Sequence, residues 1–150
     1  MKIAIASDHA GLVLKKEVAE TLVSLGHELK DFGTFDNSSV DYPDFATAVS
    51  KSVREGSHQC GVLICGTGIG MSIVANKYQG IRAALCTTEF EARMSRAHND
   101  ANVLCMGERV VGPGLGRMIA KAFVETAFEG GRHLKRVQKI ADAENESGRS

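Results

Sequence analysis

Residues 60–72 read CGVLICGTGIGMS, and the architecture is best inferred outward from this stretch. Its first six residues are apolar on both faces, as in a strand buried inside a parallel sheet. Glycines follow at positions 66, 68 and 70, and the next segment, 71–77, is predicted to form a short helix. A buried strand, a glycine-rich loop and a helix in succession are typical of α/β proteins.

The same alternation continues along the whole chain. Strands are predicted at residues 2–6, 27–32, 60–65, 81–86 and 102–106, and helices at 12–25, 44–55, 71–77, 88–98, 115–128 and 132–144. Without a composition shift or an internal repeat, the pattern predicts one α/β domain over residues 1–150, ending in a flexible tail at 141–150. Its fold class is a doubly wound, Rossmann-like parallel sheet with helices on both faces. Ligands bind such sheets at the carboxyl ends of the strands.

Charge and cysteine content exclude several classes of protein. The 150 residues contain 18 Lys and Arg against 18 Asp and Glu, so bulk charge does not hold the chain on nucleic acid or a membrane. Asp8 and His9 interrupt the N-terminal apolar run, so neither a signal peptide nor a membrane span is predicted there. The four cysteines form no CxxC pair, and Cys60 and Cys65 lie too far apart on one strand for a disulfide. Free thiols and a cytoplasmic location are therefore expected.

The glycines at 66, 68 and 70 predict an anion site, with a purely structural tight turn as the alternative. Met71 stands where a dinucleotide fingerprint needs Gly, where a phosphate loop needs Gly-Lys, and where a low-molecular-weight phosphatase needs Arg. The site is therefore expected to bind a small anion by another arrangement. A second glycine group, 112–116, also departs from the dinucleotide fingerprint, and we interpret it as packing at a helix entry.

Several titratable residues lie beside these strand ends. Cys65 is the last residue of its strand, either a reactive thiol at the loop or an inert core residue. Asp8 and His9 follow the first strand, where Asp8 can transfer protons, cap the next helix, or do both. His98 precedes the strand at 102–106, where a plain helix C-terminus is the alternative to chemistry.

The neutral total charge conceals a basic segment at residues 129–139, whose net charge is +3. Arg132 and Arg136 are four residues apart, so they share a helix face and can grip a phosphate after the Gly130-Gly131 pair. A solvated basic face is the alternative. The segment has too few basic residues for a nucleic-acid surface.

Together these motifs resemble ribose-5-phosphate isomerase type B, a family that includes the galactose-6-phosphate isomerase subunits. The matching motifs are SDHAG at 7–11, DYP at 41–43, CGTGIGMS at 65–72, ANK at 75–77, GIRA at 80–83, SRAHNDAN at 95–102, GERVVG at 107–112 and EGGRH at 129–133 with Arg136. The resemblance extends from residue 1 to about 140 in the family's order and spacing.

The resemblance implies aldose–ketose isomerisation of a sugar phosphate through an enediolate, without a metal or an organic cofactor. Cys65 would act as the base, and His98 would open the sugar ring with Asp8 nearby. Thr67 would move a proton between the sugar oxygens. The implied substrate-binding residues are Asp8, His9, Tyr42, Gly66, Thr67, Gly68, Ile69, Gly70, Asn99, Arg109, Arg132 and Arg136.

The resemblance also implies a homodimer, or a tetramer, whose pocket is shared between chains. The C-terminal helix would then pack on a partner subunit and contribute to the partner's site. The expected substrate is ribose 5-phosphate, with allose 6-phosphate and galactose 6-phosphate as six-carbon alternatives. Two further alternatives are a non-catalytic sugar-phosphate-binding protein and a thiol hydrolase or redox protein built on Cys65.

Overall fold

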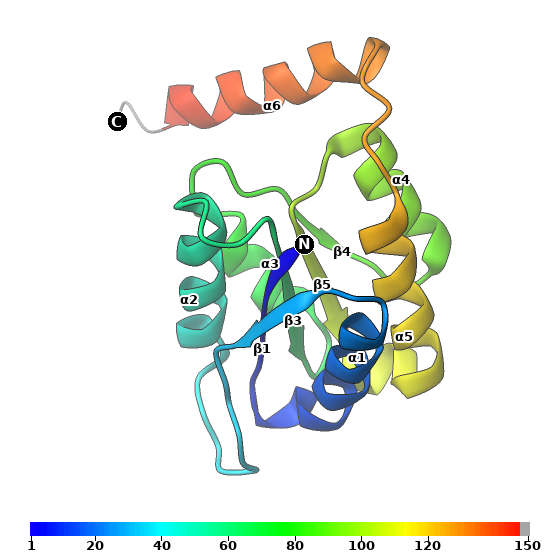
Figure 1. Ribbon diagram of the computed structural model, residues 1–150. Helices are drawn as coiled ribbons and strands as arrows, with labels where there is room; N and C mark the ends of the chain where they lie inside the picture. The colour runs from blue at the N-terminus through cyan, green and yellow to red at the C-terminus, as the bar shows by residue number, and fades with distance from the viewer. Residues whose placement is uncertain (148–150) are drawn as a thin grey trace.

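A five-stranded parallel sheet forms the centre of the computed structural model, which describes residues 1–147 (Figure 1). The strands are β1 (Lys2–Ser7), β2 (Glu28–Asp31), β3 (Cys60–Cys65), β4 (Ala83–Leu85) and β5 (Val103–Gly107). Their order across the sheet is β2-β1-β3-β5-β4, and every neighbouring pair is parallel. The parallel α/β sheet expected from the sequence is confirmed.

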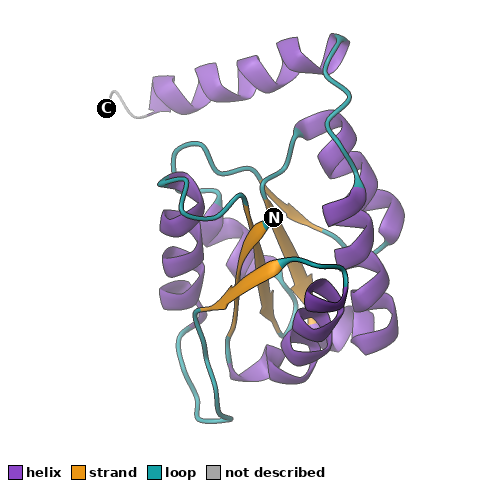
Figure 2. Ribbon diagram, in the orientation of Figure 1, coloured by secondary structure: helices purple, strands orange, loops and turns teal. Residues whose placement is uncertain are grey.

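Helices cover both faces of this sheet (Figure 2). The helices are α1 (Leu12–Ser24), α2 (Tyr42–Arg54), α3 (Ile69–Ala75), α4 (Glu89–Asn99), α5 (Glu108–Glu125) and α6 (Arg132–Ser147), with a short 3-10 turn, η1, at His9–Gly11. Side chains alternate along a strand, so Ile3 and Ile5 of β1 join the core under α1, α4 and α5. Ala4 and Ala6 point the other way and join the core under α2 and α3.

The central strand β3 is buried along its whole length, as its apolar sequence predicts. It pairs with β1 on one side and β5 on the other, so the carboxyl ends of all three strands meet at one edge of the sheet. The chain leaves β1 for β2 in one direction and reaches β3 on the opposite side of β1. This reversal is the topological switch point at which doubly wound sheets bind ligands.

Three elements differ most in length from the sequence-based expectations. Strand β4 has only three residues. Helix α5 begins at Glu108 rather than 115 and contains a kink at Gly112, where φ is 65° and ψ is 173°, next to Pro113. Gly116 lies against Leu14, as the packing interpretation predicts, whereas a Cβ atom at Gly112 or Gly114 would meet nothing within 4 Å. Helix α6 continues through Ser147, and residues 148–150 of the expected tail lie outside the described residues.

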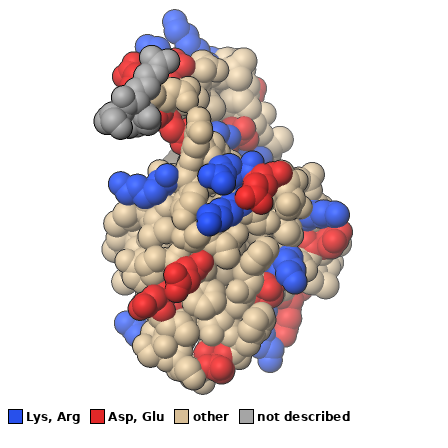
Figure 3. Space-filling view, turned by 90° about the vertical axis from the view of Figure 1, so that its left-hand side faces the viewer, with Lys and Arg blue, Asp and Glu red and all other residues tan. Residues whose placement is uncertain are grey.

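Helix α6 lies at the amino-terminal edge of the sheet, opposite the carboxyl ends of the strands (Figure 1). Both carboxylate oxygens of Glu144 accept a hydrogen bond from the Gly80 amide, just before β4, at 3.0 Å. Leu134 and Ile140 on this helix remain 62% and 46% exposed. In Figure 3 the helix forms a lobe that projects beyond the rest of the chain. One apolar part of α6 is therefore uncovered in a single chain.

The face shown in Figure 3 carries Lys and Arg interspersed with Asp and Glu, with no broad field of one sign. This agrees with the neutral net charge of the sequence. Within residues 1–147, no helix has both the length and the apolar character that a membrane span requires.

Candidate active site

The first part of the site follows β1, where the chain turns directly into η1. The Asp8 carboxylate accepts a hydrogen bond from the Ala10 amide at 2.9 Å, so Asp8 caps this turn. Its side chain also lines a cavity at the carboxyl edge of the sheet. The capping interpretation of Asp8 is thus confirmed without excluding a role in proton transfer. His9 is fixed through Nδ1, which accepts a hydrogen bond from the Val40 amide at 3.2 Å.

The glycine-rich loop after β3 wraps closely around the Cys65 thiol. The Gly68 amide donates a hydrogen bond to Cys65 Sγ at 3.1 Å, and Gly68 adopts a left-handed conformation with φ of 77°. This conformation suits glycine because a Cβ atom strains it in other residues. Thr67 Oγ1 accepts from the Ile69 amide at 3.3 Å. The loop therefore gathers amide donors and one hydroxyl beside the thiol.

Two long side chains pack against the loop glycines. A Cβ atom at Gly66 would lie 3.3 Å from a guanidinium nitrogen of Arg109, whose own amide donates to the Gly66 carbonyl at 3.1 Å. A Cβ atom at Gly70 would lie 2.5 Å from Cζ of Tyr42. A side chain at position 70 would collide with Tyr42, whereas one at position 66 would only crowd the flexible end of Arg109, which brings a permanent positive charge to the loop.

These groups surround one open cavity of about 510 Å³. Its lining comprises Asp8, His9, Ala10, Tyr42, Cys65, Gly66, Thr67, Ile69, Gly70, Ile73 and Arg109. The thiol, the carboxylate, the hydroxyl and the amide donors provide a proton acceptor beside an anion-stabilising loop. The cavity volume falls in the range usual for small-molecule sites.

The other three cysteines differ from Cys65 in their surroundings. All four thiols in the structure are free, as expected. Burial raises the pKa of Cys60 to about 11 and that of Cys86 to about 12, and it raises the pKa of Cys105 well above its usual range. None of these three lines the cavity, and their raised pKa values are those of inert core thiols.

The remaining predicted site residues do not reach this cavity within one chain. His98 and Asn99 end helix α4 just before β5, whereas Cys65 is the last residue of β3 and Arg109 lies just after the carboxyl end of β5. A five-residue strand spans roughly 15 Å, so the two groups lie at opposite edges of the sheet. Arg132 and Arg136 belong to α6, which lies at the same edge of the sheet as the end of α4 (Figure 1). Each chain thus carries two separate groups of predicted site residues.

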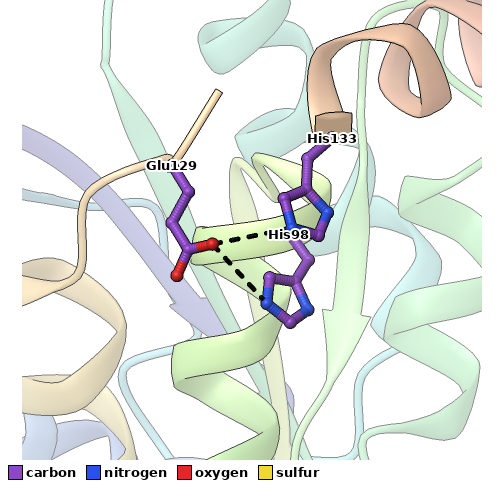
Figure 4. Close-up of side chains that lie close together, drawn as sticks. All are labelled: His98, Glu129 and His133. Carbon is purple, nitrogen blue, oxygen red and sulfur yellow. Dashed lines mark ion pairs between the residues drawn. The ribbon is translucent and has the colours of Figure 1, made fainter. Parts of the chain in front are cut away.

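A compact cluster of His98, Glu129 and His133 occupies this second edge (Figure 4). The two imidazole rings are stacked, with centroids 4.2 Å apart and planes within 4°. One candidate ligand atom from each residue lies within 4.8 Å of the others. A metal ion binds in the plane of an imidazole, and two stacked parallel rings have no common plane, so the observed arrangement does not suit a shared ion.

Four residues of these groups were not among the predicted site residues: Ala10, Ile73, Glu129 and His133. Ile73 lines the cavity from α3, and the only signal for it is its position four residues after Ile69 on the same helix face. His133 is next to the predicted phosphate-binding Arg132, but its contact with His98 joins α6 to α4 and is not encoded by local spacing.

Comparison with known proteins identifies the family of the chain. The family model for ribose/galactose isomerase matches residues 3–140. The chain is 48% identical to ribose-5-phosphate isomerase B of Escherichia coli, covering 95% of this chain and 96% of that protein. It is 40% identical to D-erythrulose-4-phosphate isomerase of Pectobacterium atrosepticum, covering 97% of both.

The solved structures agree as well. Ribose-5-phosphate isomerase B of Clostridium thermocellum is 53% identical and superposes with a TM-score of 0.96, covering 98% of this chain and 99% of that one. The resemblance inferred from the sequence motifs is confirmed over nearly the whole chain. The protein therefore belongs to the ribose/galactose isomerase family.

Proposed function

We propose that the protein interconverts ribose 5-phosphate and ribulose 5-phosphate. The observation that carries this proposal is the Cys65 thiol, which lines a cavity of about 510 Å³ and accepts a hydrogen bond from the Gly68 amide. The names of the Escherichia coli and Clostridium thermocellum relatives support the five-carbon substrate.

In the proposed reaction Cys65, as thiolate, removes the proton from C2 of the open-chain aldose. The electrons of that C–H bond form the C1–C2 double bond, and negative charge moves to the sugar oxygens beside the loop amides and Arg109. Thr67 carries a proton from O2 to O1, and the Cys65 thiol returns its proton to C1. No proton or electron is gained or lost overall, so the reaction needs no external oxidant or reductant.

The opening of the sugar ring and the binding of its phosphate require groups from the other edge of the sheet. We infer a homodimer, alone or paired into a tetramer, in which the C-terminal helix of each chain packs on its partner. His98 and Asn99 with Arg132 and Arg136 would then reach the partner's cavity, where His9 and Tyr42 complete the pocket. The exposed Leu134 and Ile140 support this packing, because they are apolar and uncovered in one chain.

The substrate is tested by assaying the purified protein with aldose phosphates of four, five and six carbons. We expect turnover of ribose 5-phosphate. Turnover of allose 6-phosphate or galactose 6-phosphate alone would refute the ribose assignment, and turnover of a four-carbon sugar alone would place the protein with the Pectobacterium relative. Binding without any turnover would indicate a sugar-phosphate-binding protein. We further propose a cytoplasmic location, which the four free thiols support.

The role of Cys65 is tested by Cys65→Ala, with Cys60→Ala at the other end of the same strand as the control. We expect Cys65→Ala to lower kcat by roughly 10²–10⁴-fold, the usual contribution of a general base, while ribose 5-phosphate still binds. Cys60→Ala should keep kcat near the wild-type value, because Cys60 does not line the cavity. A Cys65→Ala variant with the wild-type rate would show that the thiol is not the base.

A further inference from the structure

The stacked pair of His98 and His133 joins two helices that carry different predicted roles (Figure 4). His98 lies at the end of α4, and its side chain is 35% exposed. His133 lies in the first turn of α6 and is only 4% exposed. The buried ring of His133 thus packs against one face of the more exposed His98 ring.

The same buried imidazole also contacts Arg132. Arg132 Nε donates to His133 Nε2 at 3.4 Å, and a guanidinium can only donate. His133 Nε2 therefore acts as an acceptor, which requires the neutral ring with its proton on Nδ1. Burial, then the positive charges of His98, Arg132 and Arg136, lower the pKa of His133 against the opposing effect of the Glu129 carboxylate, and so favour this neutral form.

Glu129 completes the cluster from the segment that precedes α6. Its carboxylate oxygen Oε2 lies 3.5 Å from His133 Nε2 and 3.9 Å from His98 Nε2. The Glu129 amide donates to the carbonyl of Ala97 at 3.0 Å, which attaches this segment to the last turn of α4. Since Ala97 is the neighbour of His98, the backbone contact and the ring stack hold α4 and α6 together at the same place.

We propose that His133 is a positioning residue, whose ring orients His98 by stacking and whose Nε2 atom orients Arg132. The ring-opening group and a phosphate-binding group are then held as one unit across α4 and α6. This inference rests on the proposed function, because it assigns His98 and Arg132 to the reaction. It predicts that the two contacts of His133 affect different kinetic constants.

Two substitutions separate these contacts. His133→Phe keeps an aromatic ring beside His98 but removes the acceptor for Arg132, so we expect KM for ribose 5-phosphate to rise about fivefold with kcat nearly unchanged. His133→Gln keeps an acceptor but removes the stacked ring, so we expect kcat to fall roughly tenfold or more with little change in KM. Lys135→Gln removes an exposed charge from the same helix and should change neither constant.

Nuclear magnetic resonance provides a readout that does not depend on turnover. The ring current of residue 133 should shift the His98 ring protons upfield in the wild type and in His133→Phe, but not in His133→Gln. Equal shifts in all three proteins, or equal kinetic constants, would overturn the positioning role. If the wild type shows the ring-current shift but turns over no sugar phosphate, the proposed function is refuted, and the kinetic role of His133 with it. The shift would still confirm that the two rings stack.

Discussion

The buried His133 gives the folded protein a defined response to acid. Burial and the neighbouring His98, Arg132 and Arg136 hold the pKa of His133 below its ordinary value of 6.5. At pH values between this lowered pKa and 6.5, residue 133 therefore binds more protons in the unfolded chain than in the folded one. The contribution of His133 to stability is thus complete above about pH 6.5 and decreases as the pH falls through the lowered pKa.

The first prediction follows from this linkage. Acidification from pH 7 to pH 5 should lower the free energy of unfolding less in His133→Phe than in the wild type, because the phenyl ring takes up no proton. Urea unfolding at a series of pH values measures both slopes. Equally steep losses in the two proteins would show that protonation of His133 is not linked to folding.

Individual residues were predictable from the sequence where they lie next to a strand end. Asp8 follows β1 and Cys65 ends β3, and parallel strands bring such positions to one edge of the sheet, whereas Arg109 was expected only from the family resemblance. His133 was not predictable in this way, because its importance comes from a ring on another helix. Local sequence does not encode which side chains two distant helices bring into contact.

At the scale of elements, the glycine at the end of β5 sets the position of the glycine-rich loop that follows β3. A Cβ atom at Gly107 would collide with the backbone of Thr67. The backbone of Gly107 is itself extended, with φ of −112° and ψ of 122°, so alanine meets no strain there apart from the collision. The loop that contains Thr67 must move if this glycine is replaced.

The second prediction compares Gly107→Ala with Gly114→Ala. Gly107→Ala should lower the free energy of unfolding by about 1–3 kcal/mol, as expected for overpacking, and should also lower kcat/KM by displacing the loop. A Cβ atom at Gly114 meets nothing within 4 Å, so Gly114→Ala should raise stability by about 0.4–1 kcal/mol and leave activity intact. Urea unfolding and a steady-state assay measure both effects. A Gly107→Ala variant as active and stable as the wild type would contradict the prediction.

Most elements were predictable because their periodicity is local. Helix α2 begins at the Tyr42-Pro43 pair, where proline suits the first turn, and β3 is apolar on both faces. The kink in α5 was not predictable from periodicity, since Gly112 and Pro113 conceal the helical turn that precedes them. The extent of β4 was also not predictable from the apolar run at 81–86, since only Ala83, Ala84 and Leu85 pair with β5.

At the scale of the whole molecule, the two groups of site residues lie on opposite edges of one sheet. Cys65 and Arg109 follow the carboxyl ends of the strands, whereas His98 and Arg132 lie at the amino-terminal edge. The motifs in the sequence contain both groups, but a linear sequence does not specify which copy of the chain supplies each group to a site. A two-fold axis can bring the two groups together, because each chain then contributes the same residues to its partner's pocket.

The third prediction tests this shared site by mixing two inactive variants. Cys65→Ala and His98→Asn should each lose activity alone. In a heterodimer of the two, one pocket combines both defects and the other combines an intact Cys65 with an intact His98. Random reassortment makes half of the dimers mixed, and each has one working pocket, so the mixture should recover about a quarter of the wild-type activity.

Mixing Cys65→Ala with Arg109→Ala is the control: both defects lie in the same group, so every pocket stays defective and no activity should return. No recovery in the first mixture although mixed dimers form would mean that each chain completes its own site. Recovery in the control would contradict the placement of Cys65 and Arg109 in one group.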